Sequence, residues 1–273
     1  MDHRKDKALS AKSTANGTYV YCVVAGKTRP RVPRVTRRLV GLGAVRALDV
    51  ERGLFLIVAD APLDRYGEAA ISRGLADLDW VSRAAVAHES VVESFIRETA
   101  VLPMKLFTIF SSDARAIDYI HANHARIAPV IKRVANHDEW GVRVVLDRSL
   151  QERARTAPRV AAGSRAAANG GAAYLSAKKA QRDAAAELAD RARETVATLY
   201  DRLDARSRLA KRRAASELPV EGGPLLLDAA FLVPRGRAAA FRSLVTREAR
   251  TLARQGYGVT VTGPWPPYSF VQD

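Results

Sequence analysis

The sequence predicts an α+β protein of two domains, an N-terminal domain close to the ferredoxin-like arrangement and a smaller C-terminal domain. Runs rich in β-branched and aromatic residues alternate with stretches whose apolar residues recur every three or four positions. One helical pattern in the second half is unusually long, and the chain ends in a β-branched run followed by prolines and aromatic residues. Such mixed patterns are typical of helices packed on antiparallel sheets.

The first half begins with strand signals. Residues 18–25 are β-branched and aromatic, which favours a first strand. Residues 44–50 and 54–59 flank a short turn that contains Gly53, as expected for a hairpin. The apolar residues of 79–99 have helical spacing, so an amphipathic helix is predicted there.

Three further elements complete the predicted N-terminal domain, which spans residues 18–146. They are a strand, a helix and a strand, at residues 102–110, 112–136 and 139–146. Residues 1–17 are polar, charged and without periodicity, which indicates a disordered basic leader.

The second half is predicted as an Ala/Arg-rich linker, residues 147–170, and a C-terminal α+β domain, residues 171–273. Its elements are a long helix, a strand, a second helix and a last strand, at residues 172–214, 225–233, 236–255 and 257–262. The apolar seam of the long helix is predicted at Leu188, Ala192, Thr195, Leu199 and Leu203.

The composition limits the classes of function. The formal net charge is +15, and residues 1–52 and 147–213 each hold an excess of eight basic over acidic residues. Such segments attract polyanions or acidic partners, or are solvated surface. The single cysteine, Cys22, excludes an internal disulfide and fits a reducing cytoplasm. No apolar stretch approaches the ~20 residues of a membrane span and no secretory signal is visible, so a cytoplasmic protein is predicted.

No catalytic, cofactor-binding or metal site is predicted. Gly26-Lys27-Thr28 resembles the end of a phosphate loop, but Tyr21 stands where the motif needs its first glycine. His88 lies on the apolar seam of its helix and is interpreted as a core histidine. His121 and His124 have no further ligand nearby in the sequence, so a solvated helix face is expected rather than a metal site.

Nucleic-acid binding is the alternative function that the charge leaves open. Basic runs such as Lys211-Arg212-Arg213 could contact phosphates. The sequence lacks zinc-finger spacing, an RNP-like aromatic pattern and a basic-zipper heptad array. A basic, RNA-chaperone-like α+β protein is therefore the second hypothesis.

The tail is the most distinctive segment. Three prolines lie within four positions, at 264, 266 and 267, which excludes a helix or a central strand there. Its aromatic residues Trp265, Tyr268 and Phe270 carry too much ring area to be left in water, so we expect the tail to dock. It either packs the second domain onto the first or anchors a partner. Basic residues Arg34, Arg37 and Arg38 are the other predicted partner contacts, for an acidic surface.

Six segments in order resemble the gas vesicle protein F/L family (GvpF/GvpL). The ending Thr-Gly-Pro-Trp-Pro-Pro-Tyr-x-Phe, residues 262–270, is similar to the end of that family. Residues 102–110 resemble its Leu-Pro-x-Arg-Phe-Gly-Thr-x-Phe strand, with Lys105 for arginine and no glycine before Thr108. The other four segments begin at Tyr19, His88, Glu139 and Gly171.

The resemblance implies an accessory or minor structural protein of gas vesicles, without catalysis or cofactors. It implies an N-terminal domain of modified ferredoxin type, and a location in the cytoplasm and at the gas vesicle. It also implies contact with the hydrophobic major shell protein during nucleation, limiting its aggregation, and with other accessory proteins. The predicted partner-binding residues on this basis are Trp265, Tyr268, Phe270, Arg34, Arg37 and Arg38.

Overall fold

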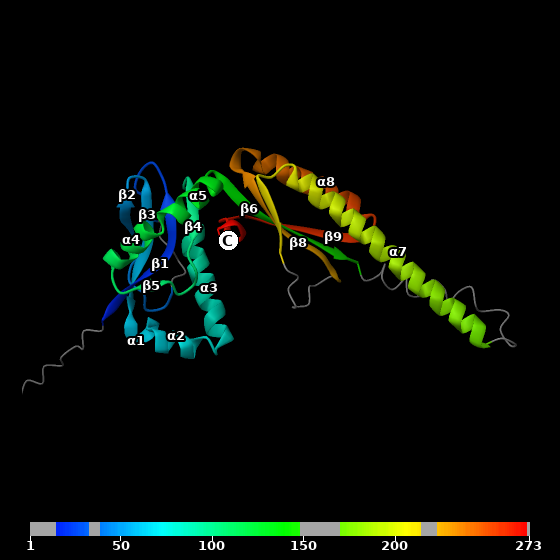
Figure 1. The fold of residues 1–273 in the computed structure, drawn as a ribbon, viewed down its shortest axis with the longest axis horizontal. Helices are drawn as coiled ribbons and strands as arrows, with labels where there is room; N and C mark the ends of the chain where they lie inside the picture. Colours follow the sequence, from blue (N-terminus) through cyan, green and yellow to red (C-terminus); the bar gives the residue numbers. More distant parts are fainter. Residues whose placement is uncertain (1–14, 33–38, 148–169, 214–222, 272–273) are drawn as a thin grey trace, which may run out of the picture. The chain divides into compact units, whose positions relative to one another are not determined.

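The computed structural model describes residues 15–32, 39–147, 170–213 and 223–271 (Figure 1). In the long helix of the second half, side chains are described from Leu175 onward. The chain divides into two compact units, Met1–Ala135 and Asn136–Asp273. Most of the predicted leader and linker, residues 1–14 and 148–169, lies outside the described residues.

The first unit contains a five-stranded antiparallel sheet. Its strand order is β2-β3-β1-β4, and β5 also pairs with β1. The strands are β1 (Asn16–Ala25), β2 (Arg46–Glu51), β3 (Leu54–Pro62), β4 (Ala100–Pro103) and β5 (Ile109–Phe110). β1 is central and almost wholly buried, as its β-branched and aromatic sequence predicts.

The described residues of the first unit form five helices: α1 (Leu63–Tyr66), α2 (Glu68–Gly74), α3 (Leu78–Glu93), α4 (Asp113–Ala122) and α5 (His124–Val134). The predicted hairpin is confirmed, with Gly53 at φ 79° between β2 and β3. The short helices α1 and α2 were not predicted, because neither is long enough to show a helical period.

Three predicted elements of this unit need correction. The helix predicted for 79–99 ends at Glu93 and is followed by turns. The strand predicted for 102–110 is two short strands, β4 and β5, separated by a turn in which Phe107 has φ 63°. The helix predicted for 112–136 is two helices that break at Asn123, whose ψ of 12° is not helical.

The described part of the second unit is a four-stranded antiparallel sheet with the helices α7 and α8 on one face (Figure 1). Its strand order is β7-β8-β6-β9. The elements are β6 (His137–Leu146), α7 (Gly170–Asp204), β7 (Leu209–Arg212), β8 (Leu225–Pro234), the 3-10 turn η2 (Arg235–Arg237), α8 (Ala238–Ala253), β9 (Tyr257–Trp265) and the 3-10 turn η3 (Tyr268–Phe270). Side chains from β6, β8, α7 and α8 form its core.

The predicted domain assignment of the strand at residues 139–146 is wrong. That strand, β6, pairs with β8 and β9 in the second sheet. Its alternating apolar residues are compatible with a place in either sheet, so only the observed pairing with β8 and β9 assigns the strand. The predicted bounds 18–146 and 171–273 therefore made the C-terminal domain too small.

With β6 reassigned, the second unit is a complete βαββαβ unit, which is the ferredoxin-like succession. The first unit has the same strand order, with β3 reaching β4 through helices. The described parts of its connection from β1 to β2, residues 26–32 and 39–45, contain no helix.

The long helix also differs from the prediction. It ends at Asp204 rather than at residue 214, and β7 follows. Ser207 Oγ donates to Leu203 O at 2.8 Å, and Arg208 N donates to Leu232 O at 2.8 Å. The first bond satisfies a carbonyl at the end of the helix, and the second begins the backbone pairing with β8. Helical periodicity alone does not reveal this pairing.

Candidate functional site

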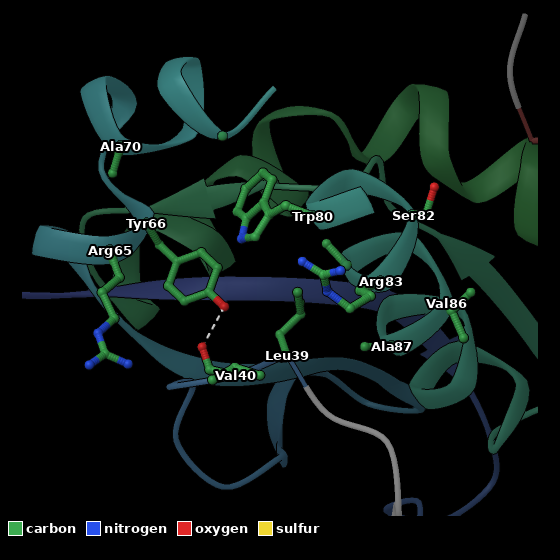
Figure 2. Close-up of a pocket in the computed structure, with 12 residues that line it drawn as sticks. Leu39, Val40, Arg65, Tyr66, Ala70, Trp80, Ser82, Arg83, Val86 and Ala87 are labelled. Carbon is green, nitrogen blue, oxygen red and sulfur yellow. Dashed lines mark hydrogen bonds between the residues drawn. The ribbon is translucent and has the colours of Figure 1, made fainter. Parts of the chain in front are cut away.

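The first unit contains an apolar groove of about 900 Å³ (Figure 2). Its walls are the segment before β2, the short helices α1 and α2, and the helix α3. The lining residues are Leu39, Val40, Arg65, Tyr66, Ala70, Gly74, Trp80, Ser82, Arg83, Ala84, Val86 and Ala87. We call this feature the α3 groove.

The start of α3 places the indole of Trp80 in the groove. Asp77 is the N-cap, and its Oδ1 accepts a hydrogen bond from Trp80 N at 3.0 Å. The indole ring then stacks on Phe107, with centroids 4.9 Å apart and an interplanar angle of 11°. Gly74 of α2 makes room for the indole, since a Cβ there would lie 2.6 Å from Trp80 Cζ3.

A buried hydrogen-bond network holds the segment that carries Phe107. His88 Nε2 lies 3.2 Å from Met104 O, and Nδ1 lies 2.7 Å from Tyr19 Oη. Because a carbonyl only accepts, the proton is on Nε2 and Tyr19 donates to Nδ1. Phe107 N donates to Tyr19 Oη at 3.3 Å. The core histidine prediction is confirmed, and burial lowers the pKa of His88 to about 4.

The other wall is fixed by Tyr66. Its ring is buried, and its hydroxyl donates to Val40 O at 2.7 Å (Figure 2). Burial raises the pKa of Tyr66, so the hydroxyl keeps its proton for this bond. The side chain of Val40 is 82% exposed at the rim.

Exposed apolar side chains occur on the elements that form the α3 groove, and two of them, Val40 and Val86, line it. Nine large hydrophobic residues of the described chain are exposed, and five of them belong to the segment before β2 or to α1, α2, α3 and the turn between α2 and α3. These five are Val40, Leu63, Leu75, Leu78 and Val86. Clustered exposed apolar surface of this kind marks interaction sites.

The predicted tail residues lie in the second unit and differ in exposure. Trp265 is 38% exposed, Tyr268 is half-buried and Phe270 is 6% exposed. The docking of the tail is confirmed by Ser269, whose N and Oγ both donate to the carboxylate of Glu139 at 2.7 Å.

Glu139 is a buried carboxylate on β6. Burial raises its pKa, while the bonds from Ser269 and the charges of Arg213 and Lys211 act in the opposite direction. Arg213 Nη1 lies 3.9 Å from Glu139 Oε1, and Arg213 Nη2 lies 2.7 Å from Asp228 Oδ1. These contacts tie the tail to the sheet.

Of the six predicted partner residues, the structure describes only the three of the tail, Trp265, Tyr268 and Phe270. Arg34, Arg37 and Arg38 lie outside the described residues. The α3 groove was not predicted at all. The one signal for it was the cluster of Leu75, Leu78 and Trp80 around the Asp77 cap, where apolar residues do not follow the helical seam.

No group of three or more histidine, cysteine, aspartate or glutamate side chains could hold a metal ion among the described residues. Within the same residues, no helix is long and apolar enough to cross a membrane.

Comparison with known proteins decides the family. The sequence model described as "Gas vesicle synthesis protein GvpL/GvpF" matches residues 17–272. The chain belongs to the GvpL/GvpF family. The match runs through both units, so the groove and the tail both lie within the family region.

Relatives and solved structures of the GvpL/GvpF family agree with this. The chain is 30% identical over 262 residues to gas vesicle protein L of a Streptomyces species, covering 94% of both chains. It is 27% identical over 274 residues to gas vesicle protein L2 of Halobacterium salinarum, covering 95% of this chain and 92% of the relative.

Two crystal structures share the fold. GvpF from Anabaena sp. PCC7120 has a TM-score of 0.64 at 16% identity, covering 94% of this chain and 97% of that one. GvpF from Microcystis aeruginosa has a TM-score of 0.62 at 15% identity, covering 94% and 99%.

Proposed function

We propose that this GvpL/GvpF protein is an assembly factor of gas vesicles that binds the hydrophobic major shell protein during nucleation and limits its aggregation. The observation that carries the proposal is the apolar α3 groove, whose lining includes the exposed side chains of Val40 and Val86. Other accessory gas vesicle proteins are further expected partners, and the gas vesicle is the expected location.

The groove has the chemistry that this task needs. A subunit of a hydrophobic shell exposes apolar surface before it is assembled, and such surface aggregates unless it is covered. An apolar groove can cover one face of an amphipathic segment. Leu39, Val40 and Val86 offer aliphatic contacts, and the indole of Trp80 offers a large rigid surface.

The groove is also pre-organised for binding. Trp80 is fixed by its stack on Phe107, and Val40 by the hydrogen bond from Tyr66. A surface that is ordered before binding loses less conformational entropy when a partner arrives. The tail supplies a separate exposed aromatic group, Trp265, which we propose as a second contact.

The test is co-expression with the major shell protein of the same gene cluster. The shell protein that stays soluble and co-purifies after nuclease treatment and a salt wash is quantified. The variant is Val40→Ser/Val86→Ser, which removes two exposed apolar side chains of the groove. We expect co-purified shell protein to fall by about tenfold or more, since each buried valine contributes about 1.5–3 kcal/mol.

Val261→Ser on β9 is the matched control, because Val261 is an exposed valine of the other unit. Its thermal stability and shell protein yield should equal those of the unchanged protein. If the unchanged protein leaves the shell protein insoluble, the proposed function is wrong. If the groove variant retains full binding, the function stands but the groove does not carry it.

A further inference from the structure

We propose that the α3 groove selects a segment that carries a carboxylate beside its apolar face, and that Arg65 and Arg83 recognise this carboxylate. The inference rests on the proposed function, since it assumes that the groove binds a partner segment. It adds the chemical class of that segment and the residues that set its register.

The charges of the groove are of one sign. Two of its twelve lining residues are charged, and both are arginines. The acidic residues of the same helices are not among the lining residues; they are Asp64, Glu68, Asp79, Glu89 and Glu93. A partner in the groove therefore meets apolar surface and two positive charges.

Both arginines have their charge available. Among the described residues, neither Arg65 nor Arg83 forms a salt bridge. Other arginines of this protein do pair: Arg143 lies 3.1 Å from Asp228 and Arg235 lies 2.9 Å from Asp138. The two groove arginines thus differ from the structural ones.

The positions of the two side chains suit recognition of a bound segment. Figure 2 shows Arg83 extending toward Leu39 and Trp80, and Arg65 lying beyond Tyr66. A segment lying over Tyr66 and Trp80 would meet an arginine on either side of this apolar floor. Carboxylates are the natural partners, because guanidinium donates two parallel hydrogen bonds to them.

The two kinds of contact have different consequences. Apolar burial supplies most of the affinity but fixes no register, since it is not directional. Ion pairs at the edge of the groove fix the position of the segment and speed its association. Because the partner shields them from water, these pairs are stronger than fully exposed ones.

The first experiment traps the carboxylate. The Arg83→Lys variant keeps the positive charge and places an amine in the groove. The complex with the major shell protein is treated with a carbodiimide, which joins amines to nearby carboxylates, and cross-linked peptides are identified by mass spectrometry. Arg115→Lys on the exposed surface of α4 is the matched control, since Arg115 does not line the groove.

We expect a cross-link from position 83 to an aspartate or glutamate of the shell protein, and none from position 115. If the shell protein co-purifies but position 83 yields no such cross-link, the carboxylate proposal is overturned while the proposed function stands. If no shell protein co-purifies with the unchanged protein, the proposed function fails first.

The second experiment removes the charges. Arg65→Gln/Arg83→Gln should lower shell protein binding by about tenfold and flatten its dependence on salt between about 50 and 500 mM. Arg65→Lys/Arg83→Lys should restore part of the binding, and Arg115→Gln should leave it unchanged. Unchanged affinity and salt dependence in the glutamine variant would overturn the proposal.

Discussion

Phe107 stacks on Trp80 with ring centroids 4.9 Å apart, although its backbone has the left-handed φ of 63°. The related family pattern has a glycine before the threonine of this strand, which is the position of Phe107. A non-glycine residue in this conformation costs about 1–2 kcal/mol. The contact with the indole offsets that cost. The unfavourable backbone conformation of Phe107 is therefore compensated by a stack that fixes Trp80 in the groove.

Phe107→Gly separates these two effects. The change relieves the backbone but removes the stack, so we expect the free energy of unfolding to fall by about 1 kcal/mol or less. Trp80 should nevertheless become more mobile and more accessible to a quencher of tryptophan fluorescence. Phe107→Ala keeps the unfavourable φ and also loses the stack, so it should be less stable than Phe107→Gly. The reverse order would contradict the strain argument.

Gly74→Ala tests the contact between α2 and the indole. The added Cβ would lie 2.6 Å from Trp80 Cζ3, so the ring must move. We expect a loss of about 1–3 kcal/mol in unfolding free energy and a shifted fluorescence maximum, as for other overpacked sites. Gly236→Ala is the control, because a Cβ at Gly236 meets no atom within 4 Å. Equal effects of the two substitutions would refute the packing role of Gly74.

The aromatic residues of the tail should differ in how much they contribute to the stability of the fold. Phe270→Ala removes a buried ring and should lower the unfolding free energy by about 3 kcal/mol. Trp265→Ala removes a ring that is 38% exposed, so its cost should be about 1 kcal/mol. Thermal melts decide the order. If Trp265→Ala also reduces shell protein binding per folded molecule, the proposed partner contact gains support; full binding would exclude it.

The bond between Glu139 and Ser269 is suited to a double-mutant cycle. Ser269 donates twice to a buried carboxylate, and hydrogen bonds to charged groups contribute about 1.5–3 kcal/mol. Glu139→Gln and Ser269→Ala should therefore couple by about 1–2 kcal/mol in urea unfolding. Additive effects would show that the Ser269 hydroxyl does not help to hold the tail, because Ser269→Ala keeps the bond from Ser269 N to Glu139.

His88 should make stability depend on pH. Its pKa is lowered to about 4 in the folded protein, against about 6.5 in the unfolded chain. The unfolded chain therefore binds a proton that the folded protein rejects, and stability falls as the pH drops from 6.5 toward 4, by roughly 3 kcal/mol. The slope of unfolding free energy against pH should flatten in His88→Gln and persist in His121→Gln, which changes an exposed histidine.

The sequence anticipated the features that depend on local chemistry. Gly53 occupies the hairpin turn and His88 is a core residue, because turns and apolar seams depend on only a few neighbouring residues. The docking of the tail also followed from its rings and prolines.

Features that depend on long-range pairing escaped prediction. The strand at 139–146 fits either sheet by its pattern, and only pairing with β8 and β9 assigns it. The α3 groove combines Val40, Tyr66 and Trp80 from three elements. Trp80 is in turn held by its stack on Phe107, which comes from a fourth segment. No periodicity within one segment can place such residues together.

The edges of the second sheet have a consequence for how this protein can meet an aggregating partner. One outer strand, β7, has only four residues and carries Lys211 and Arg212. The other, β9, contains Pro264, which has no backbone donor. Short, charged and proline-bearing edges resist strand addition by another chain. The second sheet is therefore a poor template for β-aggregation, which is a property that the proposed role beside an aggregating shell protein would require.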